Sequence, residues 1–164
     1  MYSTPLAYMI TFTTYGTWLH GNSRGSIIEQ PNGTHLLNKE SRLEAYQKQI
    51  MTESPFVLDE RSRQIILQAM LDVAQNRHWI IPAIHIRSSH IHSIVKAHPK
   101  PERIMNDLKA YCTRALRANN YSRKHFWTHH GSTRYLYTDA KIQEAVHYVL
   151  YEQGEPMTLC AQPQ

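Results

Sequence analysis

Two histidines separated by one residue, His90 and His92, are the side chains of this sequence best placed to do chemistry together. Residues at this spacing point to the same face of a β-strand, so both imidazoles can reach one metal ion from a rigid scaffold. The apolar neighbours Ile91, Ile94 and Val95 are what a central strand uses to bury its other face. The alternative is a strand with two histidines that face solvent or a polar core.

A second group of candidates lies on the helix that we expect at 140–153. Tyr148 and Glu152 are four residues apart, so they lie one above the other at the border of its apolar stripe. A tyrosine near a metal-bound phosphate can act as a nucleophile, and a carboxylate one turn later can complete the metal site. Two imidazoles with oxygen ligands suit Mg²⁺ or Mn²⁺ when phosphate and water fill the other positions. Two alternatives remain: an ordinary half-buried tyrosine, and a metal hydrolase in which His90, His92 and Glu152 activate a water.

The charge balance favours an anionic partner, with nucleic acid as the first candidate. The chain has 18 Lys and Arg against 13 Asp and Glu, together with 11 His and 10 Tyr. Cations can hold phosphates, and aromatic rings interleaved with them can stack on unpaired bases. The alternative is a solvated charged face. A non-catalytic nucleic-acid-binding module also fits this composition. The candidate DNA-binding residues are Arg103, Lys109, Arg114, Arg117, Arg123, Lys124 and Arg134.

The elements that must position these side chains follow from hydrophobic spacing and turn residues. We expect helices on one side of an antiparallel sheet, an α+β fold that is ferredoxin-like or RRM-like, with the tyrosine on the last helix. The stretch 21–33 reads as a loop by composition, Pro82 predicts a bulge or an edge contact, and the tail after Pro156 reads as loosely ordered. The expected strands are 8–14, 79–87, 90–97 and 133–137, and the expected helices are 39–51, 60–77, 101–118 and 140–153.

The length of 164 residues suits one domain, which we place at 1–164 with an insert at about 21–58 and a tail at about 156–164. No apolar run approaches the roughly 20 residues of a membrane span, and the first residues do not resemble a secretory signal. Cys112 and Cys160 form no paired motif. A reduced, cytoplasmic protein is therefore expected. With DNA as its partner, it would associate with the nucleoid.

The combination of His90-Ile91-His92 with a tyrosine helix 58 residues downstream resembles the IS200-like single-tyrosine HUH transposases, which include the REP-associated tyrosine transposases. The stretch from Phe126 to Asp139, followed by the segment 145–151, resembles the closing strand and tyrosine helix of that family. The resemblance covers roughly residues 7–156. Two departures stand out: Glu152 occupies a position where relatives carry Gln or Asn, and the Asn-Pro that often follows the tyrosine in the REP-associated group is absent.

This resemblance implies an enzyme that cleaves and rejoins single-stranded hairpin DNA through a 5′-phosphotyrosine. It implies that Tyr148 is the nucleophile, that His90 and His92 bind a divalent metal, Mg²⁺ or Mn²⁺, and that Glu152 lies where a further ligand approaches the metal. It also implies a homodimer. A domesticated nuclease that processes chromosomal REP-type hairpins is the alternative within the same family.

Overall fold

The computed structural model describes residues 4–19, 26–30, 33–37 and 40–162 and contains one five-stranded antiparallel sheet. The strand order is β6-β1-β5-β4-β7, so β5 lies at the centre with β1 and β4 as its neighbours. A separate hairpin joins β2 to β3. The elements are β1 (Ala7–Thr14), β2 (Ser26–Gln30), β3 (Gly33–Leu37), α1 (Ser41–Ile50), α2 (Glu60–Arg77), β4 (Ile80–Ile86), β5 (His90–Lys96), α3 (Pro101–Ala118), β6 (Trp127–Leu136), α4 (Asp139–Tyr151) and β7 (Thr158–Ala161).

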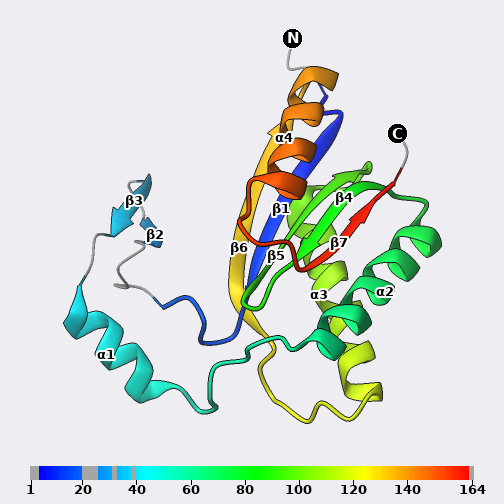
Figure 1. The fold of residues 1–164 in the computed structure, drawn as a ribbon. Helices are drawn as coiled ribbons and strands as arrows, with labels where there is room; N and C mark the ends of the chain where they lie inside the picture. Colours follow the sequence, from blue (N-terminus) through cyan, green and yellow to red (C-terminus); the bar gives the residue numbers. More distant parts are fainter. Residues whose placement is uncertain (1–3, 20–25, 31–32, 38–39, 163–164) are drawn as a thin grey trace.

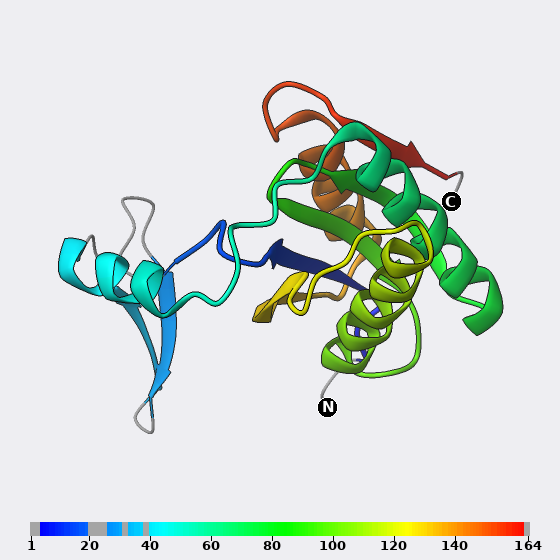
Figure 2. The ribbon, with the colours of Figure 1, turned by 90° about the horizontal axis from the view of Figure 1, so that it is seen from below.

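The helices cover both faces of this sheet, so the expectation that they lie on one side is wrong, although the predicted α+β class is confirmed. Helices α2 and α3 pack on one face and α4 packs alone on the other (Figures 1 and 2). The reason lies in the central strand, which is apolar in both directions. Ile91 and Val95 face α2 and α3, whereas Ile94 belongs to the cluster beneath α4.

The larger core lies between the sheet and the pair α2 and α3. Helix α3 contributes an apolar stripe to it, because Ile104, Leu108, Cys112 and Leu116 recur every four residues and are all fully buried. Helix α2 begins where the Asp59 side chain accepts a hydrogen bond from the Ser62 amide at 2.7 Å. This layer makes the sheet a rigid platform for the opposite face.

Helix α4 covers only part of its face of the sheet. The smaller cluster beneath it consists of Ala7, Ala83, Ile94, Leu136, Ile142, Ala145, Val149 and Leu150. Four of these residues belong to α4, and the strand residues come from β4 and from one end of β1, β5 and β6. The other end of the same face is left to polar side chains. The histidines of β5 lie in that part of the face.

Two predictions about loops are wrong. Part of the stretch expected as a loop at 21–33 forms β2, while 21–25 and 31–32 lie outside the described residues. The tail was expected to be loosely ordered, but β7 pairs with β4, and the Gln162 amide donates to the Pro82 carbonyl at 3.0 Å. Of the two alternatives predicted at Pro82, a bulge or an edge contact, the register shift between Ile80 and Ala83 agrees with the bulge.

The region of the predicted insert stands apart from the sheet. Figures 1 and 2 show α1 and the β2–β3 hairpin projecting to one side of the domain. Helix α1 has no buried residue, and the rings and alkyl groups of Tyr46 and Ile50 are exposed. None of the helices in the described part of the chain combines the length and apolar character that a membrane crossing needs.

Candidate active site

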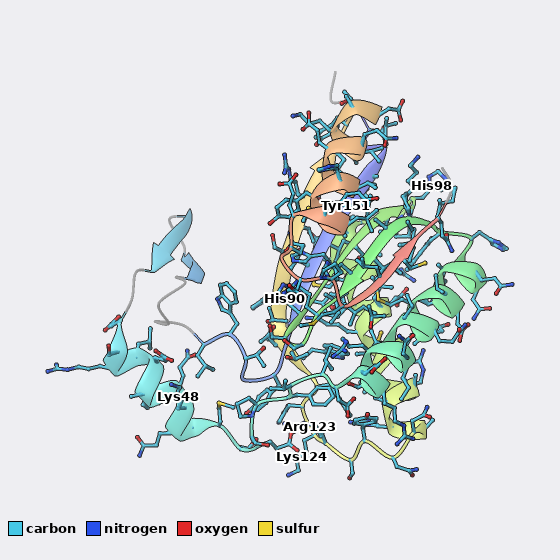
Figure 3. All side chains as sticks on the ribbon, in the orientation of Figure 1. Lys48, His90, His98, Arg123, Lys124 and Tyr151 are labelled. Atoms are coloured by element: carbon cyan, nitrogen blue, oxygen red, sulfur yellow. The ribbon has the colours of Figure 1, made fainter. Side chains whose placement is uncertain are left out.

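The two histidines of β5 lie side by side on the face that α4 partly covers. Their ring centroids are 4.8 Å apart and their planes are nearly perpendicular. Because β5 is the central strand and Ile91 between them is fully buried on the other face, the backbone beneath the pair is held on both sides. In Figure 3, His90 lies below α4, on which Tyr151 is labelled.

Each imidazole is oriented by a hydroxyl group. The Nδ1 atom of His92 lies 2.8 Å from Oγ1 of Thr11, its neighbour across the strand pair, and Nδ1 of His90 lies 3.0 Å from Oγ of Ser89. His92 is 8% exposed, and burial, followed by the proximity of His90, lowers its pKa to about 3. His92 is therefore a neutral imidazole, the form that binds metals. The hydroxyl partners set the ring orientation, as groups around a metal site commonly do.

Tyr148 reaches this pair from the last turn of α4. Its ring centroid is 6.3 Å from that of His92, and the two rings meet edge to face. Tyr148 as a whole remains 41% exposed, so it is open to a substrate as well as close to the histidines. The helix that carries it is capped at Thr138, whose hydroxyl accepts from the Lys141 amide at 3.2 Å. Tyr151 is much more exposed and lies outside this contact.

The structure does not bring Glu152 to the histidines, which corrects its prediction as a metal ligand. Helix α4 ends at Tyr151, and the Glu152 carboxylate lies 3.0 Å from Nδ1 of His147, an exposed side-chain contact on the same helix end. Among the described residues, no cluster of three His, Cys, Asp or Glu side chains is arranged to share a metal ion.

Gln153 takes the place that was expected for Glu152. Its amide nitrogen lies 3.4 Å from the Tyr148 carbonyl, and its side chain is a hydrogen-bond partner of His92. Donation by the nitrogen leaves the amide oxygen to face the imidazole. The signal in the sequence was Gly154, whose φ of 76° marks the left-handed turn after the helix. Once the helix ends at Tyr151, residue 153 rather than 152 returns toward the sheet.

An open pocket of about 210 Å³ adjoins the tyrosine on the β1 and β6 side. It is lined by Met9, Thr11, Ser132, Arg134 and Tyr148. Arg134 is therefore the one predicted DNA-binding residue that the structure places beside the tyrosine. Its guanidinium supplies positive charge there, and the hydroxyl groups of Thr11 and Ser132 supply hydrogen-bonding groups. Thr11 and Ser132 were missed as site residues, although strand alternation places Thr11 on the same face as Met9.

Lys109 is not available to DNA, so its prediction as a DNA-binding residue is wrong. Its side chain is buried, and Nζ donates to the carbonyls of Thr128, His129 and His130 at 2.8, 3.3 and 3.1 Å. Burial lowers the pKa of Lys109 to about 8. The lysine organises the start of β6, where the pairing with β1 shifts register.

The other predicted DNA-binding residues lie away from the tyrosine. Arg103, Arg114 and Arg117 are exposed on α3, which covers the opposite face of the sheet. Arg123 and Lys124 lie together in the loop before β6, at the end of the domain nearest α1 (Figure 3). The role of these residues in DNA binding stays a prediction. The structure shows only that these residues lie away from Tyr148.

Comparisons with known proteins identify the family and the fold. A family model described as "Transposase IS200 like" matches residues 46–150. The fold is similar to a REP-associated tyrosine transposase solved bound to a REP hairpin, with a TM-score of 0.51 and 14% identity, over 93% of this chain and 69% of that one.

A crystal structure from Deinococcus radiodurans R1, of a protein described as a transposase, has a TM-score of 0.51 and 13% identity, over 89% of this chain and 92% of that one. The search of curated proteins gave no match. Because the family model spans more than half of the sequence and includes His90, His92 and Tyr148, the chain belongs to the IS200-like transposases.

Proposed function

We propose that this transposase cleaves and rejoins single-stranded DNA beside hairpins, through a covalent bond between Tyr148 and a 5′-phosphate. The observation that carries the proposal is the approach of the Tyr148 ring to within 6.3 Å of His92, inside a cluster that also holds His90 and Gln153. A partly exposed phenol beside two imidazoles is well placed to attack a phosphodiester. Both residues fall within the range matched by the family model.

Each residue of the candidate site would have a separate role in this reaction. The Tyr148 oxygen would attack the phosphorus atom and give up its phenol proton to solvent. The displaced 3′ oxygen would take up a proton and leave as a free 3′-hydroxyl. The reverse attack by a 3′-hydroxyl restores a phosphodiester and frees the tyrosine, so no nucleotide is hydrolysed. Arg134, on the wall of the pocket beside Tyr148, would hold the negatively charged strand. The Thr11 and Ser132 hydroxyls face the same space.

The side chains present fit a divalent cation. His90 and His92 each have Nδ1 beside a hydroxyl group, His92 is neutral, and the Gln153 amide adds an oxygen donor. Two imidazoles and one oxygen leave positions for water and phosphate around Mg²⁺ or Mn²⁺. When bound, such a cation would polarise the scissile phosphate and offset the charge that develops there. Glu152 is not part of this proposal.

The proposed partner is hairpin DNA. A solved relative of similar fold was bound to a REP hairpin, and the net charge of +5 suits a polyanionic partner. We also propose that the protein acts as a homodimer, which its family resemblance implies.

The proposal is tested with a library of single-stranded oligonucleotides in which a fixed stem-loop is flanked by randomised arms. The purified protein is incubated with the library and Mn²⁺, and SDS-resistant protein–DNA adducts are isolated and sequenced. The library removes the need to know the recognition sequence. We expect one enriched cleavage position, an adduct at the 5′ side and a free 3′-hydroxyl on the released strand.

Two tyrosines on the same helix provide a matched pair of variants. Tyr148→Phe removes the proposed nucleophile, whereas Tyr151→Phe alters a more exposed phenol three residues away. We expect the adduct to vanish in the first variant and to persist in the second. An adduct that survives in Tyr148→Phe would remove the nucleophile assignment, and one that forms equally well in EDTA would remove the metal.

A further inference from the structure

His85 is a fully buried histidine that the proposed chemistry does not use. It lies on β4 directly opposite His92, on the face of the sheet that carries α4, and its side chain is 0% exposed. Burial lowers its pKa. A buried imidazole among apolar residues needs hydrogen-bond partners for both ring nitrogens. The identity of those partners shows what the residue does.

The two nitrogens of His85 join the end of α4 to the segment that follows it. Nδ1 lies 3.0 Å from the carbonyl oxygen of Val149, and the Met157 amide donates to Nε2 at 3.3 Å. The second bond requires a lone pair on Nε2, so the proton is on Nδ1 and is donated to Val149. Val149 lies in the last turn of α4, where carbonyls have no partner further along the helix.

The segment between these two contacts contains Gln153 and follows directly from Tyr148. It is held a second time by Arg87, at the end of β4, whose guanidinium donates to the Glu155 carbonyl at 3.0 Å. Beyond it, β7 pairs with β4, and Leu159 lies opposite His85. The chain on both sides of the tyrosine turn is thus fastened to β4, the strand next to the histidine pair.

We infer that His85 is the positioning residue that holds Tyr148 and Gln153 over His92 of the same chain, so that the tyrosine acts in cis. The inference rests on the proposed function for the role of Tyr148, and it adds the device that sets its place. His85 acts through Val149 and Met157 and touches no substrate. Loss of its bonds frees the last turn of α4 and the segment 152–157 while the sheet below remains intact.

The kinetic test compares variants of two adjacent residues on β4. His85→Phe removes both hydrogen bonds, His85→Asn keeps an amide donor toward Val149, and Ile84→Ala damages the core on the other face of the same strand. We expect the single-turnover rate of adduct formation to fall at least tenfold in His85→Phe, because small displacements of reacting groups are costly. We expect His85→Asn to recover most of that loss, and DNA affinity to be unchanged in both.

Equal losses in His85→Phe and Ile84→Ala would overturn the positioning role, because they would reflect stability alone. If His85→Phe does not fold, Met157→Pro removes the amide that donates to Nε2 without altering the imidazole. A severalfold fall in the rate of adduct formation is expected there, and a rate equal to that of the wild type would refute the inference.

The cis arrangement is tested by mixing two inactive chains. Tyr148→Phe keeps the histidines and His92→Ala keeps the tyrosine, so a tyrosine that serves a partner subunit would restore adduct formation in the mixture. We expect no recovery. Recovery to a substantial fraction of wild-type activity would overturn the cis assignment.

Hydrogen exchange separates this inference from the proposed function. In the wild type we expect the Met157 amide to be protected, and we expect that protection to be lost in His85→Phe but kept in Ile84→Ala. An unprotected Met157 amide in the wild type would overturn the contact itself. Protection in a wild-type protein that forms no adduct would overturn the proposed function and leave the fastening of α4 standing.

Discussion

The hydroxyl of Thr11 provides a sharp test of how the histidine pair is oriented. Thr11→Val keeps the shape of the side chain and removes Oγ1, which lies 2.8 Å from Nδ1 of His92. A buried nitrogen left without its partner costs about 1–3 kcal/mol. At about 1.4 kcal/mol for each factor of ten, that cost corresponds to a loss of metal affinity of about 5- to 140-fold. This range includes the roughly 10- to 100-fold loss that usually follows removal of a group that orients a metal ligand.

The measurement is the Mn²⁺ concentration that gives half-maximal adduct formation, which we expect to rise about tenfold to hundredfold in Thr11→Val. Urea unfolding without metal gives a second readout, in which we expect the free energy of unfolding to fall by about 1–2 kcal/mol. The two readouts separate the loss of metal binding from the loss of stability.

Thr13→Val is the matched control, because it removes a hydroxyl on the same face of β1, two residues away. Its Oγ1 bonds to Thr128 Oγ1 at 2.7 Å and not to an imidazole. We expect its Mn²⁺ requirement to stay within about threefold of the wild type, since the hydrogen bond of His92 is untouched. Equal Mn²⁺ requirements in the two variants would refute the orienting role of Thr11.

Three further predictions concern Gly131, Lys109 and the pair Glu152 and Gln153. A Cβ on Gly131 would lie 2.5 Å from the Thr11 carbonyl oxygen, so Gly131→Ala should destabilise the protein by about 1–3 kcal/mol in urea unfolding, and wild-type stability would refute the close approach. The folded pKa of Lys109, about 8, lies below its ordinary value, so the unfolded chain holds more protons above pH 8. Wild-type stability should therefore rise by roughly 2 kcal/mol between pH 8 and 10.5 relative to Lys109→Met, after allowance for partial solvent screening, and parallel pH profiles would contradict this. In a titration of adduct formation with Mn²⁺, Glu152→Gln should match the wild type and Gln153→Ala should need about tenfold more metal; the reverse order would restore Glu152 as the ligand.

The closeness of His90, His92 and Tyr148 was predictable because it depends on short-range geometry. The spacing of His90 and His92 fixes their common face on a strand, and the apolar stripe of α4 leaves Tyr148 at its border. These are local consequences of the periods of strand and helix. The α+β class followed for the same reason, from the order of periodic segments.

The rest of the site depends on where helices and strands end and on which of their surfaces pack together. The spacing of residues within one segment determines neither. Gln153 rather than Glu152 lies near His92 because the helix ends at Tyr151, and helix periodicity does not determine that boundary. Lys109 resembles its cationic neighbours on α3 in the sequence, but only the tertiary structure brings three carbonyls of β6 over its ammonium. The pairing of β7 with β4 was hidden because its partner lies about 75 residues earlier.

The position of α4 between β6 and β7 has a mechanical consequence. These strands are the two opposite edges of one sheet, so the chain on each side of the tyrosine helix is hydrogen-bonded into that sheet. A DNA strand covalently bound to Tyr148 would exert a force on the helix whenever the DNA moved. That force would be shared by the hydrogen bonds of both edge strands, and the contacts of His85 would hold the end of the helix between them. The helix would therefore stay on its sheet while the attached DNA moved.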